Sequence, residues 1–187
     1  FSIPDNYEKP FLPSLETINY LTLDDDYEPQ PFINLYKNSL HYIDSKIATI
    51  LSAFESELDN TIIIITGDHG KEFNDSKQGY WGHNSNYSPY QTRVPLLIKW
   101  PQKKPAVIKE KTSHFSIVPT LMTEALGVNS SALSYSSNIS LFDEKSTKPW
   151  VFMGRDGYYA INDGKQVYEL DRLGNFTIFN ENYQKNC

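Results

Sequence analysis

Residues 61–75 read TIIIITGDHGKEFND, and this stretch decides the expected fold. Four isoleucines at 62–65 are followed by a Thr and a Gly, and then by Asp68 and His69 side by side. A short β-branched run without polar alternation predicts a strand covered on both faces, as in the parallel sheets of α/β proteins. Ligands of such sheets bind beyond the carboxyl ends of the strands, where this Asp-His pair stands.

Asp68 and His69 have two interpretations. A carboxylate next to an imidazole forms a natural half-site for a divalent cation, since Zn²⁺ and similar ions accept both O and N ligands. Gly67 and Gly70 on either side would allow a sharp turn and a close approach of the backbone to a ligand. Alternatively, an Asp directly after a strand caps a helix or forms an Asx-turn. The local pattern leaves both interpretations open.

The segment before the isoleucines predicts a long amphipathic helix that begins near Phe32. Apolar side chains recur there at three- and four-residue steps, which is the spacing of one helix face. The stripe consists of Tyr36, Leu40, Ile43, Ile47, Ile50, Leu51, Phe54 and Leu58. A helix directly before a buried strand is typical of an α/β core.

Three further segments complete the predicted core. Residues 11–23 alternate roughly between apolar and polar side chains after a Pro, which indicates a strand. Residues 94–100, VPLLIKW, predict a second buried strand. Residues 116–127 predict a helix with Pro119 in its first turn and Gly127 at its end.

The end of the chain has a different pattern. Short β-rich runs, PWVFMG, YYAIND, QVYELD and NFTIFN, are separated by turns that contain Asp-Gly or Leu-Gly. Asp-Gly between short β runs is a hairpin signal. The sequence therefore predicts a parallel α/β core over residues 1–148 and a small antiparallel meander over residues 149–187, packed on the same domain.

Composition excludes several classes of protein. The 187 residues are 39% hydrophobic and 21% charged, which is typical of a folded globular protein. No apolar run approaches the roughly 20 residues of a membrane-spanning helix. The net charge of −6 without a basic stripe argues against nucleic acid as a partner. The sequence has no initial Met, and we expect it to be a piece of a longer protein.

The motifs together carry a resemblance. TGDHGKEF followed by GHNSNYSPYQTRVPLLIKWP resembles the sulfatase branch of the alkaline phosphatase superfamily. SHFSIVPTLMTEALG is similar to that family's Pro-Thr-Leu helix, with Ser116 where an Asp is usual. The likeness covers roughly residues 11–128 in order. Within the branch, YQTRVPLLIKWP and the tail look closest to the YejM/PbgA group, whose members have N-terminal membrane helices and a periplasmic globular domain.

The resemblance implies roles for three residues. Asp68 and His69 match the family's C-terminal pair of metal ligands, for a divalent ion that could be Zn, Mn, Mg or Ca. His83, in GYWGHNSNYS, matches a substrate-binding His that approaches the transferred group or a second metal. The family's nucleophile (a Thr, a Ser or a modified Cys) and its first metal carboxylates lie far upstream. No catalytic nucleophile is therefore expected in this chain.

Two functions follow from the resemblance. The first is a metal-dependent hydrolase or transferase that acts on phosphate or sulfate esters, including lipid headgroups, at the periplasmic face of a bacterial inner membrane. Membrane attachment would come from segments outside this sequence. The second is a catalytically weak or silent lipid-sensing module that controls the lipopolysaccharide content of the envelope. The intact GDHG favours the first, and the YejM/PbgA likeness favours the second.

The loop after the Asp-His pair is expected to return His83 to that pair. Glu72 and Asp75 in this loop are interpreted as exposed charges. Three aromatic residues flank His83, namely Tyr80, Trp81 and Tyr87. They either line a headgroup pocket or pack the loop down, and the sequence leaves both possibilities open.

Overall fold

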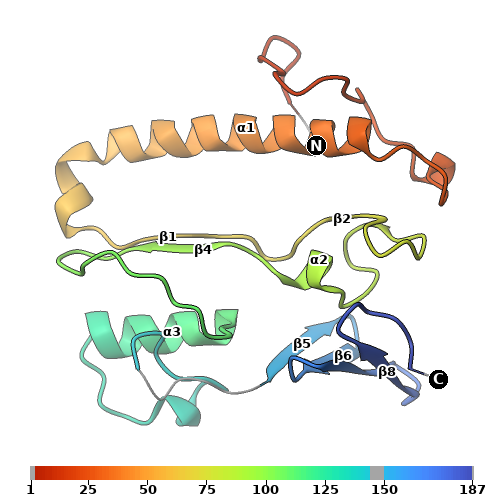
Figure 1. Ribbon diagram of the computed structural model, residues 1–187. Coiled ribbons are helices and arrows are strands. Elements are labelled where there is room, and N and C mark those ends of the chain that lie inside the picture. The colour runs from red at the N-terminus through yellow and green to blue at the C-terminus, as the bar shows by residue number, and fades with distance from the viewer. Residues whose placement is uncertain (1–2, 144–149, 187) are drawn as a thin grey trace. The chain divides into compact units, whose positions relative to one another are not determined.

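A computed structural model describes residues 3–143 and 150–186 of the chain (Figure 1). The chain divides into two compact units, Phe1–Lys104 and Pro105–Cys187. The predicted boundary between residues 148 and 149 falls outside the described residues. Within the described ranges, no helix has both the length and the apolar character that a membrane crossing requires.

The structure confirms the long helix that the periodicity of the sequence predicted. Helix α1 spans Gln30–Ala53 and is followed by a 3-10 helix, η2, over Glu55–Asn60. Pro31 lies in the first turn of α1, where its missing N–H costs no hydrogen bond. Phe32 is fully buried and Leu35 is 3% exposed. The N-terminal third of the helix therefore contributes the core of this unit.

The predicted apolar stripe of α1 is at most half-buried, and the buried apolar residues of the helix, Phe32 and Leu35, lie just before it. Farther along the helix, Leu40, Ile43, Ile50 and Phe54 are 44%, 50%, 57% and 55% exposed. Periodicity thus identified the helix correctly, and much of its apolar stripe is exposed in the described structure.

The predicted strand at residues 11–23 is wrong. The backbone of this segment bonds to side chains of α1 instead of to another strand. Phe11 N donates to Asn38 Oδ1 at 3.0 Å, and Asn38 Nδ2 donates back to Phe11 O at 3.0 Å. Asn34 Nδ2 donates to Pro13 O at 2.8 Å. Since buried amides of the helix satisfy these backbone groups, the segment needs no strand partner.

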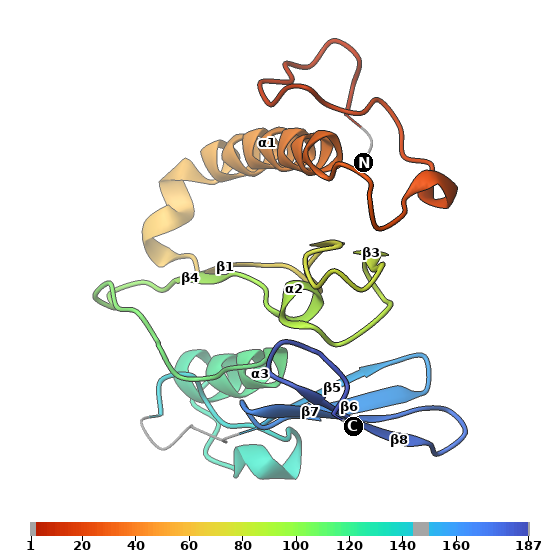
Figure 2. The ribbon, with the colours of Figure 1, turned by 45° about the vertical axis from the view of Figure 1, so that its right-hand side comes forward.

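The isoleucine run forms a strand, but its pairing differs from the prediction. Strand β1, Ile63–Thr66, pairs with β4, Leu96–Lys99, in an antiparallel two-stranded sheet. The connection between them contains one hairpin and the single-turn helix α2, Pro89–Thr92 (Figure 2). Residues 67–95 would be long enough for a parallel crossover, which usually contains a helix that packs on the sheet. They fold instead as a hairpin and one helical turn, and β4 returns beside β1 in the opposite direction. The isoleucines are accordingly half-buried and not covered on both faces.

The hairpin between β1 and β4 packs on the beginning of α1. Its strands are β2, Glu72–Phe73, and β3, Trp81–Gly82, and they pair antiparallel. The Phe73 ring lies edge-on to Phe32 with centroids 5.0 Å apart, and Trp81 stacks on Phe32 at 6.2 Å. Trp81 therefore packs the loop down, which was one of the two possibilities left open by the sequence.

Glu72 is buried, which corrects its interpretation as an exposed charge. Its side chain has no exposed surface. Oε2 accepts hydrogen bonds from Asn86 Nδ2 at 2.8 Å, Ser88 Oγ at 3.0 Å and Gln91 Nε2 at 2.8 Å. Oε1 accepts from Ser76 Oγ. One carboxylate thus joins the hairpin to residues 86–91, while Asp75 stays exposed as expected.

The second unit has a short helical region and a sheet. The helical region comprises η3, His114–Ser116, α3, Ile117–Thr120, and the π-helical turn η4, Leu121–Ala125. It ends before Gly127, which has a positive φ of 66°. This agrees closely with the helix predicted at residues 116–127.

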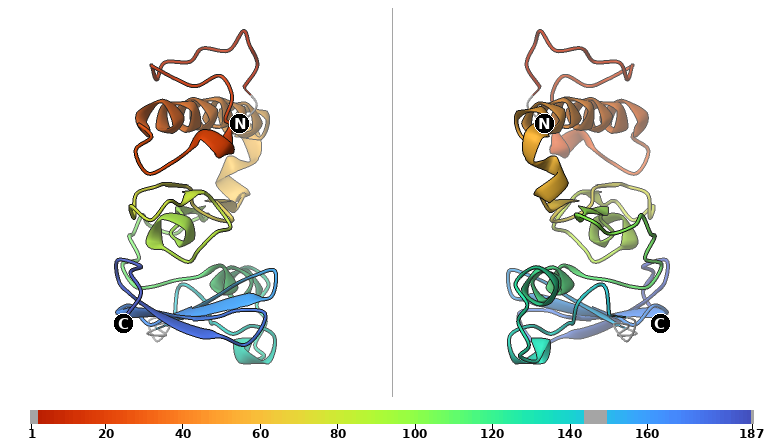
Figure 3. Two further views of the ribbon diagram at one scale, coloured as in Figure 1. Left: turned by 90° about the vertical axis from the view of Figure 1, so that its right-hand side faces the viewer. Right: turned by 90° about the vertical axis from the view of Figure 1, so that its left-hand side faces the viewer.

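The predicted meander is confirmed. Its strands are β5, Val151–Arg155, β6, Tyr158–Asn162, β7, Gln166–Leu170, and β8, Phe176–Asn180. They pair antiparallel in sequence order and form one twisted layer (Figure 3). All strand pairs among the described residues are antiparallel. The fold is therefore mixed α/β with small antiparallel sheets, and the expectation of a parallel core is wrong for the described residues.

We expect Glu72→Gln to lower the free energy of unfolding by about 2–4 kcal/mol. The variant replaces one accepting oxygen of the carboxylate by an NH₂ group, which would face the N–H and O–H donors of the neighbouring side chains. Urea unfolding of the first unit measures the change. Glu55→Gln, an exposed position on η2, is the matched control and should stay within about 0.5 kcal/mol. Equal stability of the two variants would contradict the structural role of Glu72.

The turn before β8 allows a prediction about pH. Hydrogen bonds from the Asn175 side chain and backbone lower the pKa of Asp171. A lowered pKa in the folded state adds stability above the ordinary carboxyl value, and this stability is lost as pH falls through the folded pKa. We expect Asn175→Ala to raise the pKa of Asp171 toward its ordinary value in an NMR titration. Asp163, whose lowered pKa depends first on the backbone amides of Lys165 and Gln166, should not change.

Candidate functional site

Asp68 and His69 lie one residue past the end of β1, as the sequence predicted. Asp68 Oδ1 and His69 Nε2 are 3.6 Å apart, and the side chains are 89% and 43% exposed. Two donors that bind one tetrahedral Zn²⁺ at about 2.0–2.2 Å lie about 3.4 Å from each other. The observed separation is therefore compatible with both atoms contacting one ion, and the exposure gives an ion access.

Hydrogen bonds orient this pair. His69 Nδ1 lies 2.8 Å from Gly70 O, and a carbonyl can only accept, so Nδ1 carries the hydrogen when the ring is neutral. The lone pair is then on Nε2, the atom nearer Asp68. Metal-binding imidazoles usually have such a second hydrogen bond, which fixes the tautomer. Asp68 Oδ1 accepts from His69 N at 3.0 Å, and no helix begins here, so Asp68 is not a helix cap.

Of the two glycines beside the pair, Gly70 is the one that the structure requires. Its N–H donates to Gln91 O at 2.8 Å, which draws the two backbones together. A Cβ at this position would lie 2.1 Å from Tyr90 O. A Cβ on Gly67 would have no contact closer than 3.4 Å. The close approach at Gly70 is therefore to the protein's own backbone.

The hairpin returns His83 to His69, as expected. Because Glu72 pairs with Gly82, the residues just beyond this pair, Lys71 and His83, lie opposite each other. The imidazoles of His69 and His83 stack with centroids 4.2 Å apart and an interplanar angle of 10°. The antiparallel pairing of β2 with β3 produces this proximity, and no parallel strand contributes to it among the described residues.

Several neighbours affect the charge of His83. Burial, then the His69 imidazole, then the Lys71 ammonium lower the pKa of His83, and the Asp68 carboxylate opposes them. Lys71 Nζ lies 3.4 Å from His83 Nδ1, where the ammonium donates. In the neutral ring the remaining hydrogen is then on Nε2, so His83 can donate a hydrogen bond from that atom to a ligand oxygen.

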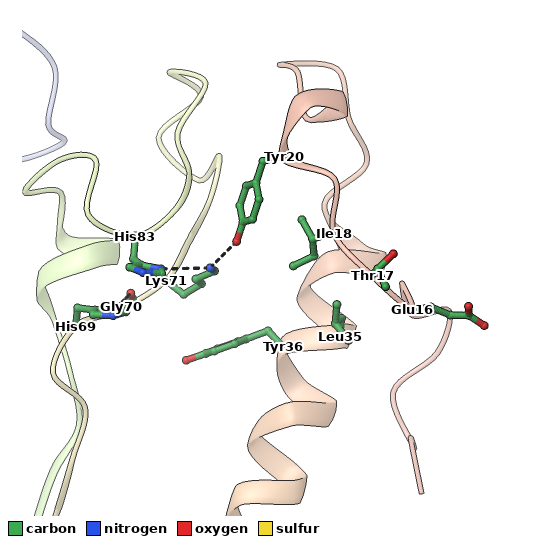
Figure 4. Close-up of a pocket in the computed structure, with 10 residues that line it drawn as sticks. All are labelled: Glu16, Thr17, Ile18, Tyr20, Leu35, Tyr36, His69, Gly70, Lys71 and His83. Atoms are coloured by element: carbon green, nitrogen blue, oxygen red, sulfur yellow. Dashed lines mark hydrogen bonds between the residues drawn. The ribbon is translucent and has the colours of Figure 1, made fainter. Parts of the chain in front are cut away.

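A pocket of about 470 Å³ opens beside the two histidines. Figure 4 shows His69 and His83 on one side, the first turns of α1 on the other, and Tyr20 above the ammonium of Lys71. The lining residues are Glu16, Thr17, Ile18, Tyr20, Leu35, Tyr36, His69, Gly70, Lys71 and His83. The site thus combines the end of β1, the hairpin, residues 16–20 and α1.

The sequence did not point to Lys71 and Tyr20. Tyr20 lies in the 3-10 turn η1, Tyr20–Thr22, within a segment predicted as a strand, and its phenol accepts from Lys71 Nζ at 3.1 Å. Hairpin register could have placed Lys71 opposite His83 if the two short strands had been recognised. The aromatic residues that flank His83 in sequence do not line the pocket.

The described residues offer a partial metal site. No group of three or more His, Cys, Asp and Glu side chains with metal-binding geometry occurs in residues 3–143 and 150–186. Asp68 and His69 could supply an oxygen and a nitrogen to a divalent ion. Because structural and catalytic Zn²⁺ sites use three or four protein ligands, a complete site needs additional donors.

Comparison with known proteins gives the family. Residues 4–128 match the family model described as Sulfatase. An uncharacterized protein of Haemophilus influenzae is 31% identical over 154 residues, which are 79% of this chain and 25% of that protein. The inner membrane protein YejM of Salmonella typhimurium is 25% identical over 163 residues, 86% of this chain and 27% of YejM. The uncharacterized sulfatase YidJ of Escherichia coli is 32% identical over 92 residues, 49% of this chain and 18% of YidJ. The chain spans about a quarter of the length of the first two relatives.

We expect Gly70→Ala to destabilise the first unit by about 1–3 kcal/mol and to separate His69 from His83, because the new Cβ must push the Tyr90 backbone away. Gly67→Ala is the matched control and should be tolerated, since its Cβ meets only ordinary contacts. Urea unfolding gives the stability, and ¹H NMR of the imidazole resonances reports the stacking. An unchanged spectrum for Gly70→Ala would disprove the close approach.

Proposed function

The chain belongs to the sulfatase family, and on that premise we propose that it forms part of the active site of a metal-dependent hydrolase or transferase of phosphate or sulfate esters. The observation that carries the proposal is the 3.6 Å separation of Asp68 Oδ1 and His69 Nε2, with the second nitrogen of His69 bonded to Gly70 O. An exposed, oriented oxygen–nitrogen pair is a suitable half of a divalent metal site.

The residues have separate roles in this proposal. When bound, a divalent ion would neutralise charge on the ester oxygens. Asp68 and His69 would hold that ion. His83 would donate a hydrogen bond from Nε2 to a non-bridging or leaving oxygen, which stabilises the charge that develops there. The nucleophile and the remaining ligands would come from a part of the protein outside this sequence.

The proposed location is supported by the name of one relative. One of them is named an inner membrane protein, and this chain covers about a quarter of its length. We propose that the whole protein is attached to a bacterial inner membrane and that the present part lies on the periplasmic face. Ester substrates at that surface, including lipid headgroups, would then reach the pocket.

A lipid-sensing module without turnover is the alternative function. It would retain the fold and the pocket but would not need a metal ion. The geometry at Asp68 and His69 favours the catalytic proposal, because sensing alone gives no reason to hold two ligand atoms at a chelating distance. A measurement of metal binding therefore distinguishes the catalytic proposal from the sensing alternative.

We expect this chain to bind Mn²⁺ or Zn²⁺ weakly, with a Kd on the order of 10–1000 μM, because two protein ligands are fewer than a complete site uses. Isothermal titration calorimetry measures the affinity. Asp68→Ala should abolish the binding, whereas Asp59→Ala, an exposed carboxylate in the same unit, should not. Submicromolar binding that Asp68→Ala removes would overturn the half-site, and no binding at all would favour the sensing module.

The chain alone should not hydrolyse p-nitrophenyl phosphate or p-nitrophenyl sulfate above the blank rate, since the proposed nucleophile is outside it. Release of p-nitrophenol at 405 nm is the measurement, with Mn²⁺ or Zn²⁺ present. Turnover that His69→Ala abolishes would place the nucleophile within these 187 residues and would contradict the proposed division of the site.

A further inference from the structure

We propose that Lys71 and Tyr20 form an anion-binding subsite beside His83, and that the pocket takes a phosphate monoester with an apolar alkyl or aryl group. The inference rests on the proposed function and specifies its substrate class. In this arrangement the phosphate contacts the ammonium and the phenol, and the apolar group lies against Ile18, Leu35 and Tyr36.

The ammonium of Lys71 is held in a defined position at the pocket wall. Nζ donates to Tyr20 Oη at 3.1 Å and to His83 Nδ1 at 3.4 Å. The centroid of the Phe32 ring lies 5.5 Å from Nζ. A cation oriented by the Tyr20 phenol, the His83 imidazole and the Phe32 ring attracts an anion without a large loss of side-chain entropy on binding.

Gly82 keeps the space beside this ammonium open. It is buried, with a positive φ of 104°. A Cβ there would lie 3.4 Å from Tyr20 Cε1 and 3.5 Å from Lys71 Nζ. Any side chain at this position would therefore extend into the region where the phenol and the ammonium meet.

The opposite wall of the pocket is partly apolar, with Glu16 and Thr17 beside its apolar residues (Figure 4). Ile18 and Leu35 line it, and the ring of Tyr36 extends from α1 toward the side where His69 lies (Figure 4). The volume of about 470 Å³ lies within the range of small-molecule sites, about 300–1,000 Å³. A phosphate group alone would leave this wall without contacts, whereas a phosphate attached to an alkyl or aryl group would cover it.

The subsite is continuous with the proposed metal pair. Lys71 contacts His83, and His83 stacks on His69 at 4.2 Å. An oxygen that contacts both Lys71 Nζ and Tyr20 Oη and another directed toward His69 could therefore belong to one phosphate. Phosphate is favoured over sulfate because its second negative charge gains from both an ammonium and a metal ion.

The test is calorimetry on the 187-residue chain in EDTA, so that no metal contributes. The probes are n-hexyl phosphate, inorganic phosphate and n-hexanol. We expect hexyl phosphate to bind about tenfold or more tightly than inorganic phosphate, because it also buries its chain. Hexanol should bind more weakly than hexyl phosphate. Equal affinity for both phosphates would overturn the apolar part of the proposal.

Variants then locate the binding. Lys71→Met should weaken both phosphates about tenfold, and Tyr20→Phe should weaken them by a smaller factor. Ile18→Ala should weaken hexyl phosphate alone. Lys104→Met removes a cation from an exposed position of the same unit and should have no effect. Unchanged phosphate affinities in both Lys71→Met and Tyr20→Phe would overturn the subsite. If Lys71→Met does not fold, the conservative Tyr20→Phe variant still tests it.

Asp68→Asn separates this inference from the proposed function. It should abolish metal binding and leave the metal-free affinity for hexyl phosphate the same or higher, because a nearby negative charge is removed. Loss of hexyl phosphate binding in Asp68→Asn would contradict the Lys71 subsite. If the unmodified chain binds hexyl phosphate but neither Mn²⁺ nor Zn²⁺, the metal-dependent function is rejected and the Lys71 subsite is retained.

Discussion

The buried carboxylate of Glu72 is the interaction on which the site depends. Strands of two residues, such as β2 and β3, have little stability of their own. Glu72 fastens them to residues 86–91 through amide and hydroxyl donors, and Phe32 supplies the apolar surface beneath them. A buried charge without partners is costly, so the hairpin and residues 86–91 are stable only together. The position of His83 relative to His69 follows from that assembly.

Periodicity and turn chemistry predicted the elements that local sequence controls. The three- and four-residue spacing identified α1, and Asp-Gly pairs identified the meander of the second unit. The strand predicted at residues 11–23 was wrong because their backbone groups form hydrogen bonds with the side chains of Asn34 and Asn38. An alternating pattern does not reveal which partner a backbone group will bind. The predicted parallel orientation was wrong for β1 and β4, because a β-branched run predicts a strand and does not reveal the direction of its neighbour.

The sequence named the candidate site's exposed residues and not the residues that support them. Asp68 and His69 could be named because they come after a β-branched run, and His83 because its motif resembles that of the sulfatase family; their roles stay predictions. Glu72 was placed on the surface, since a carboxylate in a polar loop is usually exposed and its four donors come from residues up to 19 positions away. Tyr20 contributes from 51 residues before Lys71, a distance that no local pattern bridges.

The ribbon formed by β1 and β4 has a consequence for handling the protein. Each of these strands has a single strand neighbour among the described residues, so its other edge has no strand beside it. The run at residues 62–65 is uncharged, β-branched and half-exposed, which is the composition of segments that add strands from neighbouring molecules. Self-association of the purified chain should therefore begin at this edge, and a charge introduced on its outward face would improve solubility without touching the pocket.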